Sequence, residues 1–417
     1  MKLIHTADWH LGQSFHGQDR HYEHRCFLDW LLDELDTRRP DALLIAGDVF
    51  DVVNPSMKAQ ELLYDFIVRV HERLPRLTVA MIAGNHDSGA RIELPGPLMK
   101  RLRAHALGRV LWLDDGTLDA ERLLVPLENE QGEIKAWCLA LPFLRPAEVT
   151  GSRAGGEIGD DYIKGITRVH EALISAAEAK RQPGQALIAM SHAHLRGAAV
   201  SEHSERPIVI GGEESLSAAL FPPSIGYVAL GHLHRPQQVG EPRIRYSGSP
   251  LPMDFSERDY PHQVVELEFT DETLERIESV QIPRAVDMLR VGPASLENVL
   301  EELKGLEVPQ DNGISREAWP WLDIRVRLDA PRVDLRAQIE AALHGKAVRL
   351  ICISTEYRRG NAKDEAAVTL DDLGPQALFE RAWQREYGAA PDADVVDDFN
   401  ALLQSVLDAE HREGETP

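Results

Sequence analysis

Short apolar segments that end abruptly in polar residues recur through the first 270 residues of the chain. Five of them have the length and composition of buried strands: residues 2–10 (KLIHTADWH), 42–48 (ALLIAGD), 79–87 (VAMIAGNHD), 186–194 (ALIAMSHAH) and 227–234 (YVALGHLH). Residues 27–38 and 61–74 instead space their apolar positions as helices that pack against a sheet do. Strands that are apolar on both faces are covered on each side, so the pattern predicts an α/β fold with helices flanking the sheets.

The hydrophobic pattern also predicts how the chain is divided. A main domain spans residues 1–275, a small α+β domain 283–356, a polar linker 357–374, and helices 375–411. The small domain is predicted because its apolar segments alternate strand, helix, strand, helix, strand. Inside the main domain, residues 150–165 are rich in glycine and charge and predict a mobile surface loop.

Two of the later segments carry features typical of binding surfaces. In residues 322–328 apolar positions alternate with Asp323, Arg325 and Arg327, which is the period of a half-buried strand, so the two arginines share its exposed face. The last predicted helix, residues 395–411, has an apolar stripe that consists of Phe399, Leu402, Leu403, Val406 and Leu407. Such a stripe docks either on the rest of its own protein or on a partner protein, and we favour the partner.

Composition places the chain among soluble globular proteins, with 43% hydrophobic and 27% charged residues. No apolar segment approaches the roughly 20 residues needed to cross a bilayer, and the N-terminal segment turns polar too soon for a signal peptide, so we expect a cytoplasmic protein. Three widely spaced cysteines argue against a disulfide framework. The formal charge of −23 would repel a phosphate backbone unless positive charge is concentrated locally.

The polar strand ends supply oxygen and nitrogen donors and no sulfur. Asp8 and His10 are two positions apart, and so are His232 and His234. In an extended chain, the two side chains of each pair point to the same side. The full set of seven donors is Asp8, His10, Asp48, Asn85, His192, His232 and His234. Seven are too many for one tetrahedral ion but satisfy two divalent ions if Asp48 bridges them. Mixed imidazole and oxygen ligation favours Mn²⁺, with Fe²⁺, Zn²⁺ and Mg²⁺ as alternatives.

Each short motif has a plainer explanation when it is taken alone. GNHD is compatible with an ordinary polar turn, and Asp19 and His21 repeat the DxH spacing where no strand precedes them, so we interpret that copy as a surface pair. The segment SHAH offers two imidazoles; we choose His192, which directly follows the strand, and keep His194 as a candidate substrate contact. The metal interpretation depends on the joint occurrence of the motifs, each at a strand end.

In their order, the motifs DxH, GD, GNHD, H and GHxH resemble the calcineurin-like metallophosphoesterase superfamily. The segments HTADWHLGQ, GNHDS with Arg91 just after it, ALGHLHRPQ and YSGSPLPMDFSE are similar to those of the SbcD family, the nuclease subunits of bacterial SbcCD complexes. The resemblance covers the first 260 residues. It implies a layered metallophosphoesterase sandwich with a small α+β capping domain, which contacts DNA, and C-terminal helices.

The resemblance also implies roles for particular residues. One metal would be held by Asp8, His10, Asp48 and His234, and the second by Asp48, Asn85, His192 and His232. His86 would be a catalytic acid and not a ligand. Two divalent ions bring four positive charges against two ligand carboxylates, so the pocket would attract a phosphate. Asp87 is expected to anchor the turn without touching the metals.

We therefore expect a DNA nuclease, a double-strand exonuclease and single-strand or hairpin endonuclease in DNA repair and recombination. The chain has no GxxxxGK[ST] segment, so the resemblance implies a separate SbcC-like coiled-coil ATPase that docks on residues 375–411, in a heterotetramer built on a homodimer. Local positive charge would come from the metals, Arg91, Arg325 and Arg327. The alternatives are a phosphatase or cyclic-nucleotide phosphodiesterase of the same superfamily, and a scaffold that binds metal without catalysis.

Overall fold

The computed structural model describes most of the chain and divides it into two compact units, Met1–Glu356 and Tyr357–Pro417. The described residues are 1–149, 158–200, 215–308, 313, 315–329, 332, 334–357, 375–387, 390–392, 395, 396 and 399.

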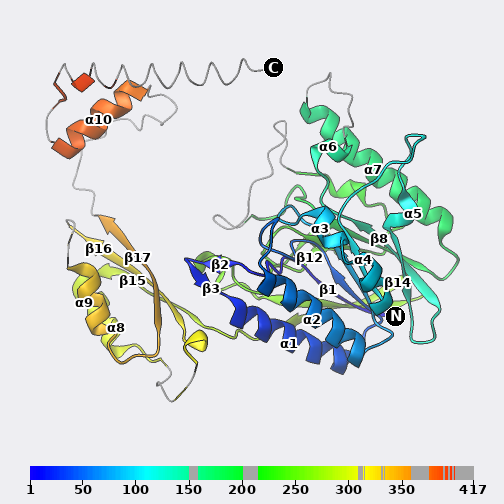
Figure 1. Cartoon of the computed structure of the whole chain (residues 1–417), viewed down its shortest axis with the longest axis horizontal. Coiled ribbons are helices and arrows are strands. Elements are labelled where there is room, and N and C mark those ends of the chain that lie inside the picture. Colours follow the sequence, from blue (N-terminus) through cyan, green and yellow to red (C-terminus); the bar gives the residue numbers. More distant parts are fainter. Residues whose placement is uncertain are drawn as a thin grey trace. The chain divides into compact units, whose positions relative to one another are not determined.

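The first sheet has six strands in the order β14-β13-β1-β4-β5-β6. These strands are β1 (Lys2–Thr6), β4 (Ala42–Ile45), β5 (Thr78–Ile82), β6 (Ala104–Leu107), β13 (Gln263–Thr270) and β14 (Thr273–Gln281). The strands β1, β4, β5 and β6 are parallel, and β13 returns antiparallel to β1. Helices α1 (His21–Arg38) and α2 (Met57–Arg73) lie side by side on this sheet and bury Phe27, Leu31, Leu63 and Phe66 against it (Figure 1).

The second sheet also has six strands, in the order β11-β12-β10-β9-β8-β7. They are β7 (Leu124–Glu128), β8 (Ile134–Leu141), β9 (Ala186–His192), β10 (Tyr227–Gly231), β11 (Gln237–Val239) and β12 (Glu241–Tyr246). Helix α7 (Ile158–Lys180) packs on its outer face through Ile166, Val169 and Leu173. The inner faces of the two sheets share one apolar cluster, which includes Leu44 and Met190. The layered α/β sandwich expected from the sequence is therefore present.

All five strands predicted from the strand-end pattern are confirmed, but they are distributed over the two facing sheets. The loop predicted for residues 150–165 is wrong from Ile158 onward, because this part begins helix α7, while residues 150–157 lie outside the described residues. Tyr162 is buried and its hydroxyl donates to the Leu144 carbonyl oxygen at 2.6 Å. A β-carbon at Gly165 would lie 2.8 Å from the Val149 carbonyl oxygen, so this glycine serves close packing and not a loop.

A third sheet has three strands in the order β15-β16-β17 and belongs to the same compact unit. It is built from β15 (Met288–Ser295), α8 (Leu296–Gly305), β16 (Trp321–Leu328), α9 (Leu335–Ala342) and β17 (Arg349–Tyr357), the alternation predicted from the sequence. The apolar residues of β16 enter its core as expected. Arg325 and Arg327 alternate with them, and each is paired with a carboxylate: Arg325 with Asp323 at 3.3 Å and Arg327 with Glu356 at 3.2 Å.

The remaining described elements are short apart from the C-terminal helix. They are β2 (Ser14–Phe15), β3 (Gln18–Asp19), α3 (Gly89–Glu93), α4 (Gly96–Met99), α5 (Ala120–Leu123), α6 (Pro146–Val149), α10 (Pro375–Tyr387) and four 3-10 turns at Lys100–Leu102, Ala218–Leu220, Phe255–Glu257 and Arg316–Ala318. In the second unit the Phe379 ring of α10 stacks on Phe399 at 4.2 Å between ring centres. Most of the predicted linker and of the last predicted helix lies outside the described residues. Among the described helices none is long and apolar enough to span a bilayer.

Candidate metal centre

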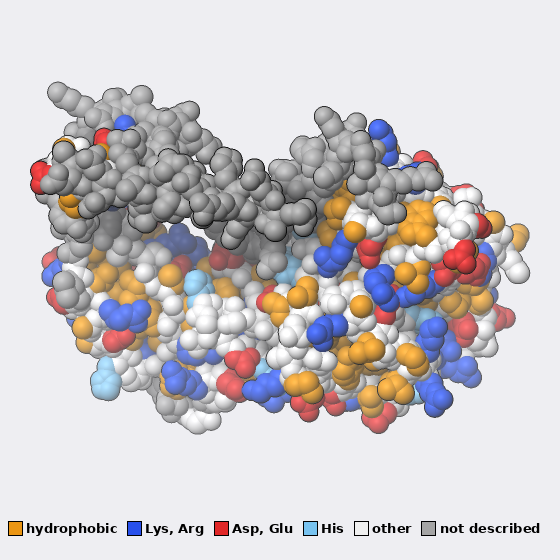
Figure 2. All heavy atoms as spheres, turned by 45° about the horizontal axis from the view of Figure 1, so that its top comes forward, with side chains coloured by type: hydrophobic (Ala, Val, Ile, Leu, Met, Phe, Trp, Pro, Cys, Tyr) orange, Lys and Arg blue, Asp and Glu red, His pale blue; other side chains and the backbone are white. Residues whose placement is uncertain are grey.

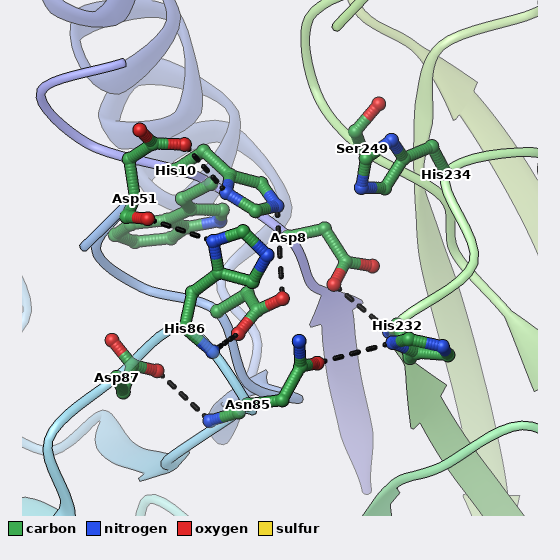
Figure 3. A network of polar contacts seen from close by, with 12 residues as sticks. Asp8, His10, Asp51, Asn85, His86, Asp87, His232, His234 and Ser249 are labelled. Atoms are coloured by element: carbon green, nitrogen blue, oxygen red, sulfur yellow. Dashed lines mark hydrogen bonds and ion pairs between the residues drawn. The ribbon is translucent and has the colours of Figure 1, made fainter. Parts of the chain in front are cut away.

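The seven predicted donors and His86 come together where the carboxyl ends of β1, β4 and β5 on one sheet meet those of β9 and β10 on the other. Figure 3 labels six of these residues: Asp8, His10, Asn85, His86, His232 and His234. Contacts between the sheets connect them directly. The His232 backbone N–H donates to Asp8 Oδ1 at 2.9 Å, and the His192 Nε2 atom lies 3.3 Å from Asp48 Oδ2. The convergence predicted from the strand ends is therefore observed, with both sheets contributing.

Asp48 lies at the centre of the cluster and is buried. Its Oδ1 accepts the His86 backbone N–H at 2.8 Å, while its Oδ2 lies 3.7 Å from His10 Nε2 on one side and 3.3 Å from His192 Nε2 on the other. Burial alone would raise the pKa of Asp48, but the adjacent His192 and His10 imidazoles outweigh it and hold this pKa well below its usual range. The carboxylate is thus charged and lies between two groups of imidazoles, as a bridging ligand would.

On the β9 and β10 side, acceptor atoms converge on one point. Asn85 Oδ1 lies 2.9 Å from His192 Nε2 and 3.1 Å from His232 Nδ1. The other ring nitrogen of His192, Nδ1, donates to the Ala46 carbonyl oxygen at 2.9 Å, so a neutral His192 presents its Nε2 lone pair to two oxygens. Burial lowers the pKa of His192, but the Asp48 charge outweighs it and raises this pKa to about 9. The position therefore attracts a cation, either a proton or a metal ion.

On the β1 side, His10 and His234 lie with their ring centres 5.2 Å apart. Each donates through Nδ1 to a carboxylate: His10 to Asp51 Oδ1 at 3.1 Å and His234 to Glu257 Oε1 at 3.0 Å. Such pairing fixes the ring and leaves Nε2 as the ligand atom. Among the described residues, His10 Nε2 and Asp8 Oδ2 are buried without a hydrogen-bond partner. Two orphaned acceptors at this point fit a bound cation.

Two groups of donor atoms lie close enough to hold an ion, with all atoms of each group within 4.8 Å of one another: His10, Asp48 and His86, and Asp8, Asp48 and His192. Both groups contain Asp48, which fits a bridging carboxylate. The residues present therefore suit a pair of divalent ions. The first group also contains His86, so these distances alone do not separate a ligand from an acid.

His86 and Asp87 have different surroundings. His86 Nδ1 donates to the Asp51 carbonyl oxygen at 2.7 Å, and its ring meets the His10 ring edge to face at 4.8 Å.

Asp87 is fully buried and accepts three backbone N–H groups, from Val49, Phe50 and Gly84, at 2.9 to 3.1 Å. Burial and the Asp48 charge raise the pKa of Asp87 to about 6. Asp87 joins the loop after β4 to the loop after β5, as expected of an anchor.

Three functional neighbours were not predicted from the sequence. Asp51 follows Asp48 by three residues, and the usual pairing of a ligating imidazole with a carboxylate is a signal that could have found it. Glu257 lies 23 positions after His234, a separation that carries no local signal. Arg145 donates to the Asp87 carbonyl oxygen at 2.8 Å and brings a positive charge to the GNHD turn, again with no sequence signal.

The other residues singled out from the sequence lie farther from the cluster. His194 is half-buried, with its ring centre 6.4 Å from that of His232, and belongs to neither donor group. Arg91 is exposed on α3. Asp19 is exposed, His21 is half-buried, and Asp19 Oδ1 accepts the His21 backbone N–H at 2.7 Å, so this DxH copy lies at the surface, as interpreted from the sequence.

Backbone strain is concentrated at this centre. Four of the donor residues adopt left-handed φ angles that side-chain-bearing residues rarely have: Asp8 at 55°, His10 at 47°, Asp48 at 45° and His232 at 102°. Such conformations persist only where the surrounding contacts enforce them, and they cluster at functional sites. The glycines beside them provide the space, since a β-carbon at Gly84 would lie 2.1 Å from Asp48 Oδ1.

Comparisons with known proteins agree with this geometry. Residues 1–236 match the calcineurin-like phosphoesterase family, and residues 284–387 match the type 5 capsule protein repressor C-terminal domain. The SbcD subunit of the SbcCD nuclease from Rhodobacter capsulatus is 40% identical over 394 residues, which are 92% of this chain and 94% of the relative. The corresponding SbcCD nuclease subunits of Escherichia coli strain K12 and Bacillus subtilis strain 168 are 31% and 30% identical, over 91% and 97% of this chain and 92% and 98% of their own.

The glycine before Asn85 offers a direct test of the centre. We expect Gly84→Ala to displace Asp48 and to weaken Mn²⁺ binding about 10- to 100-fold, the loss typical of disturbed ligand positioning. Isothermal titration calorimetry measures the affinity, and circular dichroism checks the fold. The matched control is Gly96→Ala, where no atom lies within 4 Å of the added β-carbon, so Mn²⁺ binding should be unchanged. Equal Mn²⁺ affinity in the two variants would contradict the assignment of Asp48.

Proposed function

The chain belongs to the calcineurin-like phosphoesterases and, within them, to the SbcD subunits of SbcCD nucleases, and we propose that it hydrolyses DNA phosphodiester bonds as a double-strand exonuclease and single-strand or hairpin endonuclease. The observation that carries the proposal is the convergence of buried acceptor atoms around Asp48, with His10 Nε2 and Asp8 Oδ2 left without a partner. A scaffold role would give no reason for a strained, largely buried cluster that leaves Asn85 and His86 half-buried.

We propose two divalent ions, with manganese as the first choice because imidazole and oxygen donors are mixed. Asp8, His10, Asp48 and His234 would hold one ion, and Asp48, Asn85, His192 and His232 the other. The pairing of the rings supports this division, since His10 lies beside His234 and His192 lies beside His232 at 5.4 Å. When bound, such ions supply positive charge for a phosphate and lower the pKa of water.

We assign His86 as the proton donor to the sugar oxygen that leaves. Because its Nδ1 donates to the Asp51 carbonyl oxygen, the proton available for transfer is the one on Nε2. The backbone N–H of the same residue is held by Asp48 at 2.8 Å, so the ring is fixed next to the carboxylate. Asp51 thus orients His86 through its carbonyl and His10 through its carboxylate.

The acidic overall charge limits how DNA can be held. On the face drawn in Figure 2, basic and acidic side chains are interspersed and do not form one positive field. Arg325 and Arg327 are ion-paired, which reduces the contribution expected of them. Arg145, beside the GNHD turn, and the metals supply the local positive charge, and a partner would add the rest.

The proposed partner is an SbcC-like coiled-coil ATPase that binds residues 375–411, because relatives of this chain are named as subunits of the SbcCD complex. On α10 the side chain of Leu378 is 44% exposed, which leaves apolar surface for a docking helix.

We also propose a homodimer within a heterotetramer, acting on DNA in the cytoplasm during repair and recombination. Leu94 and Leu98, 80% and 70% exposed, are candidates for contact with a second copy.

A substrate comparison tests the function. The purified protein with Mn²⁺, alone and with the partner ATPase, is offered linear duplex DNA, hairpin DNA and a phosphomonoester. We expect cleavage of DNA, and of the hairpin, with little release of phosphate from the monoester, because the site is proposed to accept a diester. Turnover of the monoester alone would refute the nuclease proposal and favour a phosphatase.

Replacing His86 distinguishes an acid from a ligand. We expect His86→Ala to slow DNA cleavage about 10²- to 10⁴-fold, the usual contribution of a general acid, while the Mn²⁺ content stays near that of the wild type. A p-nitrophenyl phosphodiester has a leaving group that needs no proton, so its hydrolysis should fall far less. The control is His21→Ala, at a histidine outside the cluster. Loss of Mn²⁺ together with equal losses on both substrates would identify His86 as a ligand.

Removal of the C-terminal segment tests the partner site. We expect a chain that ends at residue 374 to lose co-purification with the coiled-coil ATPase, because α10 and the predicted helix after it are gone. Since all seven donors lie before residue 235, Mn²⁺ binding and p-nitrophenyl phosphodiester hydrolysis should be retained. Pull-down and size-exclusion chromatography measure complex formation. A truncated protein that still forms the complex would place the partner site elsewhere.

A further inference from the structure

Arg20 is a buried arginine that lies between the two exposed or half-exposed residues of the DRH segment. Its guanidinium makes four hydrogen bonds. Two go to the Glu23 carboxylate, from Nε at 3.1 Å and from Nη2 at 2.7 Å. Two leave from Nη1, one to Gln13 Oε1 at 2.7 Å and one to the Pro252 carbonyl oxygen at 2.6 Å. The Glu23 carboxylate neutralises the charge of the guanidinium. The two Nη1 bonds are not needed for that, and they connect two separate segments of the chain.

One Nη1 partner belongs to the turn that carries His10, and the other belongs to the segment that orients His234. Gln13 ends the turn that begins at His10, since its backbone N–H donates to the His10 carbonyl oxygen at 3.0 Å. Pro252 precedes Met253, whose backbone N–H donates to Glu257 Oε2 at 2.7 Å. The other oxygen of Glu257 accepts from His234 Nδ1. Arg20 therefore connects the loop of His10 to the segment that orients His234.

The third sheet covers the Arg20 guanidinium with an aromatic side chain. Trp321 of β16 is 1% exposed, and the Arg20 guanidinium lies 5.2 Å from its ring centre and 5.5 Å from that of Phe15. Phe15 and Trp321 stack at 4.6 Å with an interplanar angle of 25°. The aromatic rings exclude water from the guanidinium, and hydrogen bonds are stronger where the local dielectric is low.

Resting on the two-metal function proposed above, we propose that Arg20 is a positioning residue for the ion held by His10 and His234, and that Trp321 couples this ion to the docking of the third sheet. Without Trp321, water would reach the guanidinium and weaken its hold on Gln13 and Pro252. Without Arg20, the two loops would lose their common partner while Asn85, His192 and His232 would keep theirs. One metal of the pair is thus selectively sensitive to this contact.

The test measures how many Mn²⁺ ions the full-length protein binds, by equilibrium dialysis, and whether they are spin-coupled, by electron paramagnetic resonance. We expect two coupled ions in the wild type. In Arg20→Met and Trp321→Ala, one of the two Mn²⁺ ions should bind at least ~10-fold more weakly, which is the loss typical of disturbed ligand support. At a Mn²⁺ concentration that fills only the stronger site, the resonance spectrum should be that of an isolated ion. Trp321→Phe keeps an aromatic face and should restore the coupled pair.

Arg276→Met is the matched control, because this arginine is also held by carboxylates, Glu266 and Glu278, but on β14 and outside the metal cluster. It should lower the melting temperature without changing the number of bound ions. If Arg20→Met does not fold, Gln13→Ala replaces it. This variant removes only the hydrogen bond from Arg20 Nη1 to Gln13, and we expect the same weakening of one Mn²⁺ ion. Two coupled ions of unchanged affinity in the variants that fold would overturn the coupling. Fewer than two ions in the wild type would instead overturn the two-metal function.

Discussion

The two six-stranded sheets approach each other so closely at the cluster of donor residues that no β-carbon fits at Gly47 or Gly231. A β-carbon at Gly231 would lie 1.9 Å from the Ala46 carbonyl oxygen, and one at Gly47 would lie 2.2 Å from His192 Nδ1. The same approach allows His192 to donate to Ala46 across the gap. Donor residues carried by different sheets face each other across this separation, and the apolar cluster shared by the inner faces of the two sheets holds them together.

Local hydrogen bonds also hold the imidazoles of the cluster in defined tautomers. His10 and His234 each donate through Nδ1 to a carboxylate, and His192 and His86 each donate through Nδ1 to a backbone carbonyl. The ring nitrogen on the opposite side, Nε2, is then the one available for a metal or a proton transfer. These hydrogen bonds fix which ring nitrogen faces the cluster, and such preorganisation limits the reorganisation needed during reaction.

Local sequence was enough to predict the strands that carry the donors, because each combines a short apolar segment with polar residues at its end. It did not place β9 and β10 on a second sheet, since sheet membership depends on which strands pair, and the partners of these two strands lie 16 to 50 residues away in the sequence. Glu257 and Arg20 were missed for the same reason: their roles depend on His234, 23 positions away, and on Pro252, 232 positions away. The loop predicted for 150–165 failed at Ile158 because Gly165 serves tight helix packing, which composition alone does not distinguish from a turn.

Strand β1, which leads to Asp8 and His10, sits in its sheet between β4 and β13. The pairing with β13 places Lys2 opposite Glu268, 266 positions later in the chain. On a ribosome that adds about 5–20 residues per second, this neighbour arrives tens of seconds after β1 has emerged. His232 and His234 also follow late in synthesis, so a prematurely released fragment lacks part of the cluster. The order of translation thus delays completion of the proposed metal cluster until more than half of this chain has been made, and the pairing of β1 with β13 until nearly two thirds has been made.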